Sequence, residues 1–226
     1  MRYKCLILDH DDTVVDSTRG IHYPAFLAAL AAMRPYHGYV SLEDYFRLNF
    51  RPGFLEYCEN SLHLTAEEVD REYEIWQSFV RERIPRCFPG VRQIIREQKA
   101  EGGLVCVVSH SVDTMILRDY AANDLPKPDA IFGWEKGREQ RKPFRYPVDR
   151  IREKFGLREE ECLVVDDLKP GADMARAAVV DFVWAAWAHH IEEIRRFMRL
   201  DGAPFFERPS DLFAYLFGRD MPEDGE

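Results

Sequence analysis

Few cysteines occur in this sequence, and none is spaced for disulfide pairing or for metal binding. The 226 residues contain five, Cys5, Cys58, Cys87, Cys106 and Cys162, with no CxxC pair. An odd number without paired spacing argues against a disulfide framework and predicts free thiols in a reducing compartment. The seven histidines show no HxxxH or HExxH spacing, which argues against a zinc site.

The chain also lacks a long apolar run and an excess of basic residues. No run approaches the ~20 residues of a membrane span, and the N-terminal apolar stretch is too short for a signal peptide. A net charge of −9 argues against a nucleic-acid binder, which normally carries a basic face. We therefore expect a cytoplasmic protein with no membrane or nucleic-acid partner. An anionic substrate stays open, because a bound divalent cation reverses the local field.

What the sequence does contain is a repeated alternation of short apolar runs and helical patterns. The content, 46% hydrophobic and 31% charged, is that of a globular protein. Continuous apolarity predicts strands covered on both faces, as in a parallel sheet, at 5–8, 104–108, 130–132, 162–165, 182–186 and 204–206. Helices are predicted near 90–101, 112–122, 147–155, 171–178, 190–199 and 210–217. This rhythm predicts an α/β fold with a doubly wound, Rossmann-like parallel sheet that binds ligands beyond the carboxyl ends of its strands.

The segment between the first two strands breaks this rhythm. From Ser17 to Arg96 no convincing strand is found, but Ser41 and Thr65 each begin a stretch of capping-box form. After Thr65, apolar residues recur at spacings of four, three and four and mark one helix face: Val69, Tyr73, Trp76 and Val80. We therefore predict an inserted all-helical cap domain at 17–87, within a core formed by residues 1–16 and 88–226.

Four aspartates lie within eight residues directly after the first strand, beginning with Asp9-His10-Asp11-Asp12-Thr13. Such a segment is often only a solvated turn. Carboxylates this dense repel one another unless a cation lies among them, and a divalent metal with oxygen ligands is the natural partner. Of two carboxylates spaced two residues apart, one can attack phosphorus while the other transfers a proton.

This segment resembles the DxDxT motif of the haloacid dehalogenase superfamily, with Asp9, Asp11 and Thr13 at its three defined positions. Three further motifs follow in the family's order. Ser109 closes the second strand, and Lys142 begins a stretch similar to KPxPxP. Asp166 and Asp167 follow the next core strand, with Gly171 taken as the turn glycine of the family's E-D-S-x-x-G form.

The resemblance implies a phosphatase that acts on a small phosphorylated metabolite. Asp9 would form an aspartyl-phosphate, Asp11 would act as general acid and base, and Thr13, Ser109 and Lys142 would complete the catalytic site. Mg²⁺ would be held by Asp9, by the backbone carbonyl of Asp11 and by Asp167. Asp166 lies one residue before that last ligand and is the alternative to it.

Other functions compatible with these residues are a sugar phosphomutase, a haloacid dehalogenase and a non-catalytic binding protein. A phosphomutase would use the same groups. A dehalogenase needs neither Asp11 nor a metal, and a binding protein should have lost one of the four motifs. Several positions depart from the family, with His110 after Ser109 where Asn is frequent and Val179 where Gly is usual. Neither the substrate nor the oligomeric state can be predicted from these residues.

Overall fold

The computed structural model describes residues 1–222, and its centre is a six-stranded, fully parallel sheet. The strand order is β5-β4-β1-β6-β7-β8. The strands are β1 (Cys5–Leu8), β4 (Leu104–Val108), β5 (Ala130–Phe132), β6 (Cys162–Asp166), β7 (Asp181–Ala185) and β8 (Phe205–Phe206). The chain first winds outward from β1 to β4 and β5, then crosses back to β6 and continues in the opposite direction. The predicted doubly wound α/β fold is therefore confirmed.

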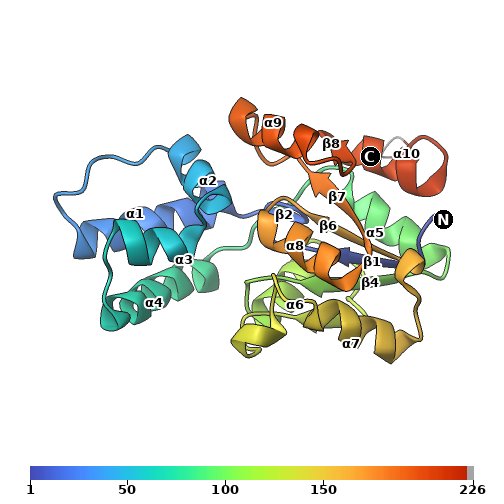
Figure 1. The fold of residues 1–226 in the computed structure, drawn as a ribbon, viewed down its shortest axis with the longest axis horizontal. Helices are drawn as coiled ribbons and strands as arrows, with labels where there is room; N and C mark the ends of the chain where they lie inside the picture. Colours follow the sequence, from blue (N-terminus) through green and yellow to red (C-terminus); the bar gives the residue numbers. More distant parts are fainter. Residues whose placement is uncertain (223–226) are drawn as a thin grey trace. The chain divides into compact units, whose positions relative to one another are not determined.

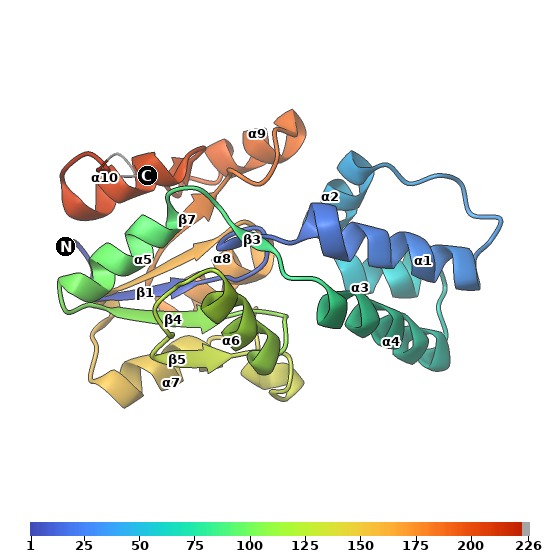
Figure 2. The same ribbon diagram turned by 180° about the vertical axis from the view of Figure 1, so that it is seen from behind.

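Helices cover both faces of this sheet (Figures 1 and 2). Alternate strand residues such as Leu6 and Leu8 share one buried cluster with α5 (Val91–Ala100), α6 (Asp113–Ala122) and α10 (Pro209–Phe217). The other strand residues, such as Cys5 and Ile7, are buried toward the opposite face. That face carries α7 (Tyr146–Phe155), α8 (Lys169–Ala178) and α9 (Glu192–Leu200). Burial on both faces explains why the strands are continuously apolar.

The predicted core elements agree with the observed ones to within two residues at each end. Two short strands were missed, β2 (Val15–Asp16) and β3 (Arg86–Cys87), which pair in a second sheet. A strand of two residues has no periodicity for a sequence pattern to reveal. Among the described residues, no helix is long and apolar enough to cross a membrane.

The backbone contacts divide the chain into two compact units. One consists of Met1–Val15 with the segment from Arg86 onward, and the other is Asp16–Pro85. The second unit contains α1 (Tyr23–Met33), α2 (Leu42–Phe50), α3 (Phe54–Glu56) and α4 (Ala66–Glu82), with helical turns at Thr18–His22 and Tyr57–Ser61. Its own apolar cluster includes Phe26, Leu30, Tyr45 and Leu48.

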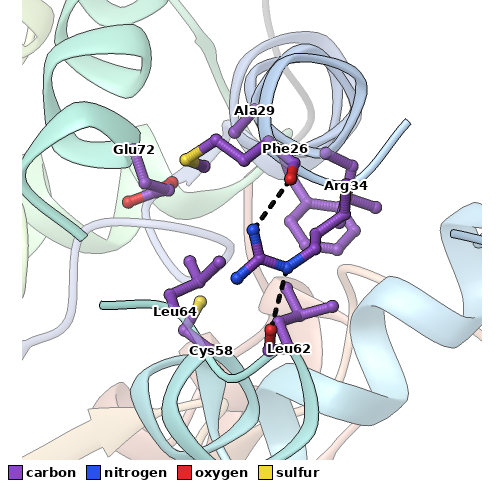
Figure 3. Close-up of a pocket in the computed structure, with 9 residues that line it drawn as sticks. Phe26, Ala29, Arg34, Cys58, Leu62, Leu64 and Glu72 are labelled. Atoms are coloured by element: carbon purple, nitrogen blue, oxygen red, sulfur yellow. Dashed lines mark hydrogen bonds between the residues drawn. The ribbon is translucent and has the colours of Figure 1, made fainter. Parts of the chain in front are cut away.

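Local capping contacts define where helices of this second unit begin. The Thr65 hydroxyl accepts from the Glu68 backbone N–H, and the Glu68 carboxylate accepts from the Thr65 backbone N–H, so the predicted capping box is present. The same carboxylate also receives two hydrogen bonds from Arg34, at 2.5 and 2.8 Å. Arg34 and Glu72 both line a small cavity of about 10 Å³. Figure 3 shows the two side chains there.

Candidate active site

The sequence-predicted polar residues meet at one edge of the sheet because they follow three adjacent strands. β1 lies between β4 and β6 in parallel register, so the carboxyl ends of the three strands coincide. Asp9 follows β1, Ser109 follows β4, and Asp166 ends β6, with Asp167 next. All four side chains are buried. The reversal in winding beside β1 is where open α/β sheets bind ligands.

Lys142 inserts its ammonium group between two of these carboxylates. Its Nζ lies 2.7 Å from Asp9 Oδ1 and 2.7 Å from Asp166 Oδ2, and its side chain is almost fully buried. Burial alone would lower the pKa of Lys142, but the charges of Asp166 and Asp9 outweigh it and raise that pKa above its ordinary value. Lys142 is therefore charged across the physiological pH range.

The one buried ammonium does not neutralise the carboxylates around it. Carboxylate oxygens of Asp9, Asp166 and Asp167 all lie within 4.8 Å of one another. Burial, followed by the charge of Asp9, raises the pKa of Asp166 to about 7 despite Lys142. Burial and the charges of Asp166, Asp9 and Asp12 raise the pKa of Asp167 well above its ordinary range. With all three carboxylates ionised, they and the one ammonium would carry a net charge of −2, and this oxygen-only set fits a hard divalent cation such as Mg²⁺.

Asp166 and Asp167 differ in what they contact. Asp166 Oδ2 accepts from Lys142, and its Oδ1 accepts from the Leu168 N–H at 2.8 Å, where α8 begins. Asp167 Oδ1 accepts from the Thr13 hydroxyl at 3.2 Å. Both oxygens of Asp166 therefore accept hydrogen bonds, from Lys142 and from the N-terminus of α8, whereas Asp167 accepts one from Thr13 in the loop that carries Asp9.

Gly171 has a different role from the one expected. It is not a turn residue, because it lies in the first turn of α8. A Cβ atom there would come within 2.2 Å of Asp166 Oδ2. Only glycine therefore lets the helix approach this carboxylate so closely.

Asp11 lies beside two serine hydroxyls after β4. Its Oδ2 accepts from Ser111 Oγ at 2.5 Å and from Ser109 Oγ at 3.4 Å. The Ser109 hydroxyl in turn accepts from the Ser111 N–H at 3.0 Å. Sequence reasoning missed Ser111, although a second serine two residues after Ser109 was a readable signal. Unlike the three clustered carboxylates, Asp11 is only half-buried, which leaves it able to exchange protons.

The loop between Asp9 and Val15 is fixed by contacts that the sequence did not reveal. Trp187 Nε1 donates to the Thr13 carbonyl at 3.0 Å. Asp12 has a φ of 57°, and its N–H donates to the Val15 carbonyl at 2.8 Å. Because that left-handed conformation favours Gly, Asn and Asp, it accounts for the residue type at this position.

His10 holds the same loop against α6. It is buried, its Nε2 lies 3.1 Å from Asp119 Oδ2, and its ring stacks on Tyr120 with centroids 6.0 Å apart. The chain that carries Asp9 and Asp11 is therefore held on several sides.

Taken together, these groups can attack an electropositive centre and transfer a proton beside it. Asp9 provides a carboxylate held by the Lys142 ammonium, and Asp11 provides a second carboxyl group two residues along the chain. Lys142 and Ser109 offer a positive charge and a hydroxyl donor near the same position. Such a set is suited to anionic esters.

Comparison with known proteins gives one family match and many structural matches. Residues 3–178 match the model of the haloacid dehalogenase-like hydrolases. No curated protein sequence matches the chain.

The solved structures that match share the fold at low sequence identity. A predicted phosphoglycolate phosphatase from Haemophilus somnus 129pt has a TM-score of 0.73 at 18% identity, covering 95% of this chain and 98% of its own. A haloacid dehalogenase-like family hydrolase from Streptococcus pneumoniae has a TM-score of 0.73 at 16% identity, with coverages of 95% and 98%. A mutant CbbY from Rhodobacter sphaeroides in complex with xylulose-(1,5)bisphosphate has a TM-score of 0.70 at 17% identity, with coverages of 93% and 96%.

Proposed function

This chain belongs to the haloacid dehalogenase-like hydrolase family, and from that premise we propose that it is a Mg²⁺-dependent phosphatase of small phosphorylated metabolites. The supporting observation is the buried contact of Lys142 with both Asp9 and Asp166, next to the Asp11 carboxyl on its two serines. The names of the neighbours agree with the proposal, since they include a phosphoglycolate phosphatase and a complex with a sugar bisphosphate.

In the proposed reaction, Asp9 is the nucleophile and Asp11 handles protons. An Asp9 oxygen attacks phosphorus in line, forming an aspartyl-phosphate, while Asp11 protonates the departing ester oxygen. Asp11 then takes a proton from water, whose oxygen attacks the same phosphorus and releases phosphate and free Asp9. The Lys142 ammonium offsets the charge of nucleophile and phosphate, and the Ser109 hydroxyl donates to a phosphoryl oxygen.

Asp9, Asp167 and the Asp11 backbone carbonyl would hold the Mg²⁺ ion. The fit rests on the clustered carboxylate oxygens and on their excess negative charge. When bound, the ion supplies the charge neutralisation that lets an anionic carboxylate approach an anionic phosphate. Asp166 would lie beside this site without binding the ion directly, because both of its oxygens already have partners. Thr13 would orient Asp167 through its hydroxyl.

We further propose that residues 17–87 form a cap that selects the leaving group. Within this helical unit, an open groove of about 490 Å³ is lined by Tyr39, Arg47, Arg51 and Tyr57, among others. Arg47 is paired there with Glu43 and Asp44, so Arg51 is the arginine of this groove suited to an anionic ligand. A cytoplasmic location is supported by the five cysteines, all of which are free thiols.

The proposal is tested by hydrolysis of p-nitrophenyl phosphate and ethyl phosphate with Mg²⁺ or with EDTA. We expect turnover of both esters with Mg²⁺ and none in EDTA. Asp9→Asn should give no covalent phosphoenzyme by intact mass spectrometry. Asp11→Asn should slow ethyl phosphate by roughly 100-fold or more, but p-nitrophenyl phosphate far less, because a good leaving group needs little protonation.

Asp173→Asn is the matched control, because Asp173 is exposed and pairs with Arg176 on the surface of α8. It should keep wild-type rates on both esters. Full activity in excess EDTA would exclude the metal. Equal slowing of both esters by Asp11→Asn would exclude the acid–base role of Asp11.

A further inference from the structure

The loop from Gly133 to Arg145, which carries Lys142, also holds an arginine that the proposed reaction does not use. Arg141 directly precedes Lys142, and its guanidinium carbon lies 3.8 Å from the centroid of the Trp134 ring. The backbone at Trp134 is fixed, because its main-chain N–H donates to the Ser111 carbonyl at 2.9 Å. Arg141 Nη1 also donates to the Trp134 carbonyl, at 3.4 Å. Stacking occupies one face of the guanidinium and leaves most of its in-plane N–H donors available.

Arg141 has no carboxylate partner in residues 1–222. Burial, and then the nearby charge of Arg138, lower the pKa of Arg141. Two acidic side chains of this region, Glu135 and Asp113, have other partners. Glu135 accepts from the Asp113 N–H at 3.0 and 3.1 Å, and Asp113 lies 3.8 Å from Lys136. The guanidinium groups of Arg138 and Arg141 thus repel each other within this loop.

The Trp134 ring links Arg141 to the phosphate-binding residues. His110, the residue after Ser109, meets this ring edge-on with centroids 6.0 Å apart. Its Nε2 lies 3.1 Å from the Lys142 carbonyl. Burial, then the charge of Lys142 and more weakly that of Arg141, lower the pKa of His110 to about 4, so this ring is neutral at pH 7 and lies within reach of both cations. His110 nevertheless keeps an exposed surface.

We propose that Arg141 binds a second anionic group, a carboxylate or a phosphate, on substrates whose phosphate ester is cleaved at Asp9. This inference rests on the proposed phosphatase function and narrows its substrate class to small phosphate esters with a second anion. A planar guanidinium held on an aromatic ring is preorganised for two parallel hydrogen bonds to such a group. His110 and Trp134 form the wall between the two anion positions.

Two pairs of esters test this inference, each pair differing only in the second anion. Phosphoglycolate is compared with ethyl phosphate, and propane-1,3-diyl bisphosphate with propyl phosphate. The readout is the kcat/KM of the ester with the second anion divided by the kcat/KM of its partner. This ratio cancels any effect of a substitution on the cleavage step that both esters share. We expect the wild type to prefer the member with the second anionic group in at least one pair. Arg141→Gln should reduce that ratio by roughly 10- to 100-fold, the range for a lost charge-assisted hydrogen bond. Whichever pair responds tells whether the group is a carboxylate or a phosphate.

Arg145→Gln is the matched control, because Arg145 is an exposed arginine of the same loop paired with Asp149. It should leave both ratios unchanged, and Arg141→Lys should restore part of the loss. An unchanged ratio in Arg141→Gln, or a wild type without preference in either pair, overturns the inference.

Calorimetric titration of the same ligands onto wild type and Arg141→Gln measures the affinity ratio without turnover. If no ester is hydrolysed, the proposed function fails. The affinity ratio then decides separately whether Arg141 binds the second anion: a lower ratio in the variant supports it, and an equal ratio overturns it.

Discussion

Exchanging Asp166 and Asp167 separately for asparagine tests which of the two binds the metal. Each variant removes one negative charge from the same buried cluster and keeps nearly the same shape, so a difference between them cannot come from charge alone. Asp166 is bound by Lys142 and by the Leu168 N–H, whereas Asp167 accepts from the Thr13 hydroxyl. We therefore expect Asp167→Asn to remove a direct ligand and Asp166→Asn to weaken the support around the site.

The size of the effect follows from linkage between binding and folding. At a Mg²⁺ concentration of ~100 times the wild-type Kd, binding adds about 2.7 kcal/mol to the free energy of unfolding. For a chain of this size that raises Tm by roughly 5–10 °C. If Asp166→Asn weakens Mg²⁺ binding ~10-fold, bound Mg²⁺ still adds about 1.4 kcal/mol to the free energy of unfolding, and half of the rise in Tm remains. If Asp167→Asn removes a direct ligand and weakens Mg²⁺ binding more than ~100-fold, the rise in Tm caused by Mg²⁺ falls below about 2 °C.

The metal-free protein gives an independent check on Asp167. Its pKa is raised in the folded state, so the folded state binds the proton more tightly than the unfolded state does. Stability therefore falls as pH rises above the ordinary range of an aspartate, and at pH 8 burying this carboxyl group opposes folding. In EDTA at pH 8, Asp167→Asn should melt above the wild type.

Differential scanning fluorimetry of the wild type and the two variants, with EDTA or with MgCl₂, measures all of these values. The assignment is refuted if Asp167→Asn keeps the magnesium shift and Asp166→Asn loses it. Equal losses in both variants would mean that the ion responds to net charge only.

Two further predictions concern stability away from the site. Val179 follows the last residue of α8 with φ 57° and ψ 41°, a conformation that strains a β-branched residue by ~1–2 kcal/mol. In urea titrations, Val179→Gly should therefore raise the free energy of unfolding by about 0.5–1 kcal/mol, and Val179→Ala should raise it by less. A glycine variant less stable than the wild type would contradict this. Burial raises the pKa of Glu72 to about 7 against the opposing influence of His22, so wild-type stability should fall as pH rises from about 4.5 through 7. Glu72→Gln should match the wild type at about pH 4 and exceed it by about 1–2 kcal/mol at pH 8, a figure reduced for the partial exposure of this side chain. Parallel pH profiles would refute the shift.

The sheet and the residues at its carboxyl edge were readable from the sequence because both depend on local order along the chain. Strands such as Leu104–Val108 are continuously apolar since they are buried on both faces. Once the winding order of a parallel sheet is known, polar residues that directly follow adjacent strands must lie together. That reasoning brings Asp9, Ser109 and Asp167 to one place without any knowledge of side-chain packing.

Only the tertiary structure decided which partner each of these groups has. Lys142 enters between Asp9 and Asp166 from a loop with no regular pattern, and Trp187 reaches Thr13 across 174 residues of sequence. The sequence predicts Gly171 as a turn residue, but in the structure its lack of a side chain leaves room for the Asp166 carboxylate. The stacking of Arg141 on Trp134 likewise depends on the path of one loop. Contacts of this kind join segments that neither spacing nor periodicity relates, because they are fixed by close packing between elements far apart in the chain.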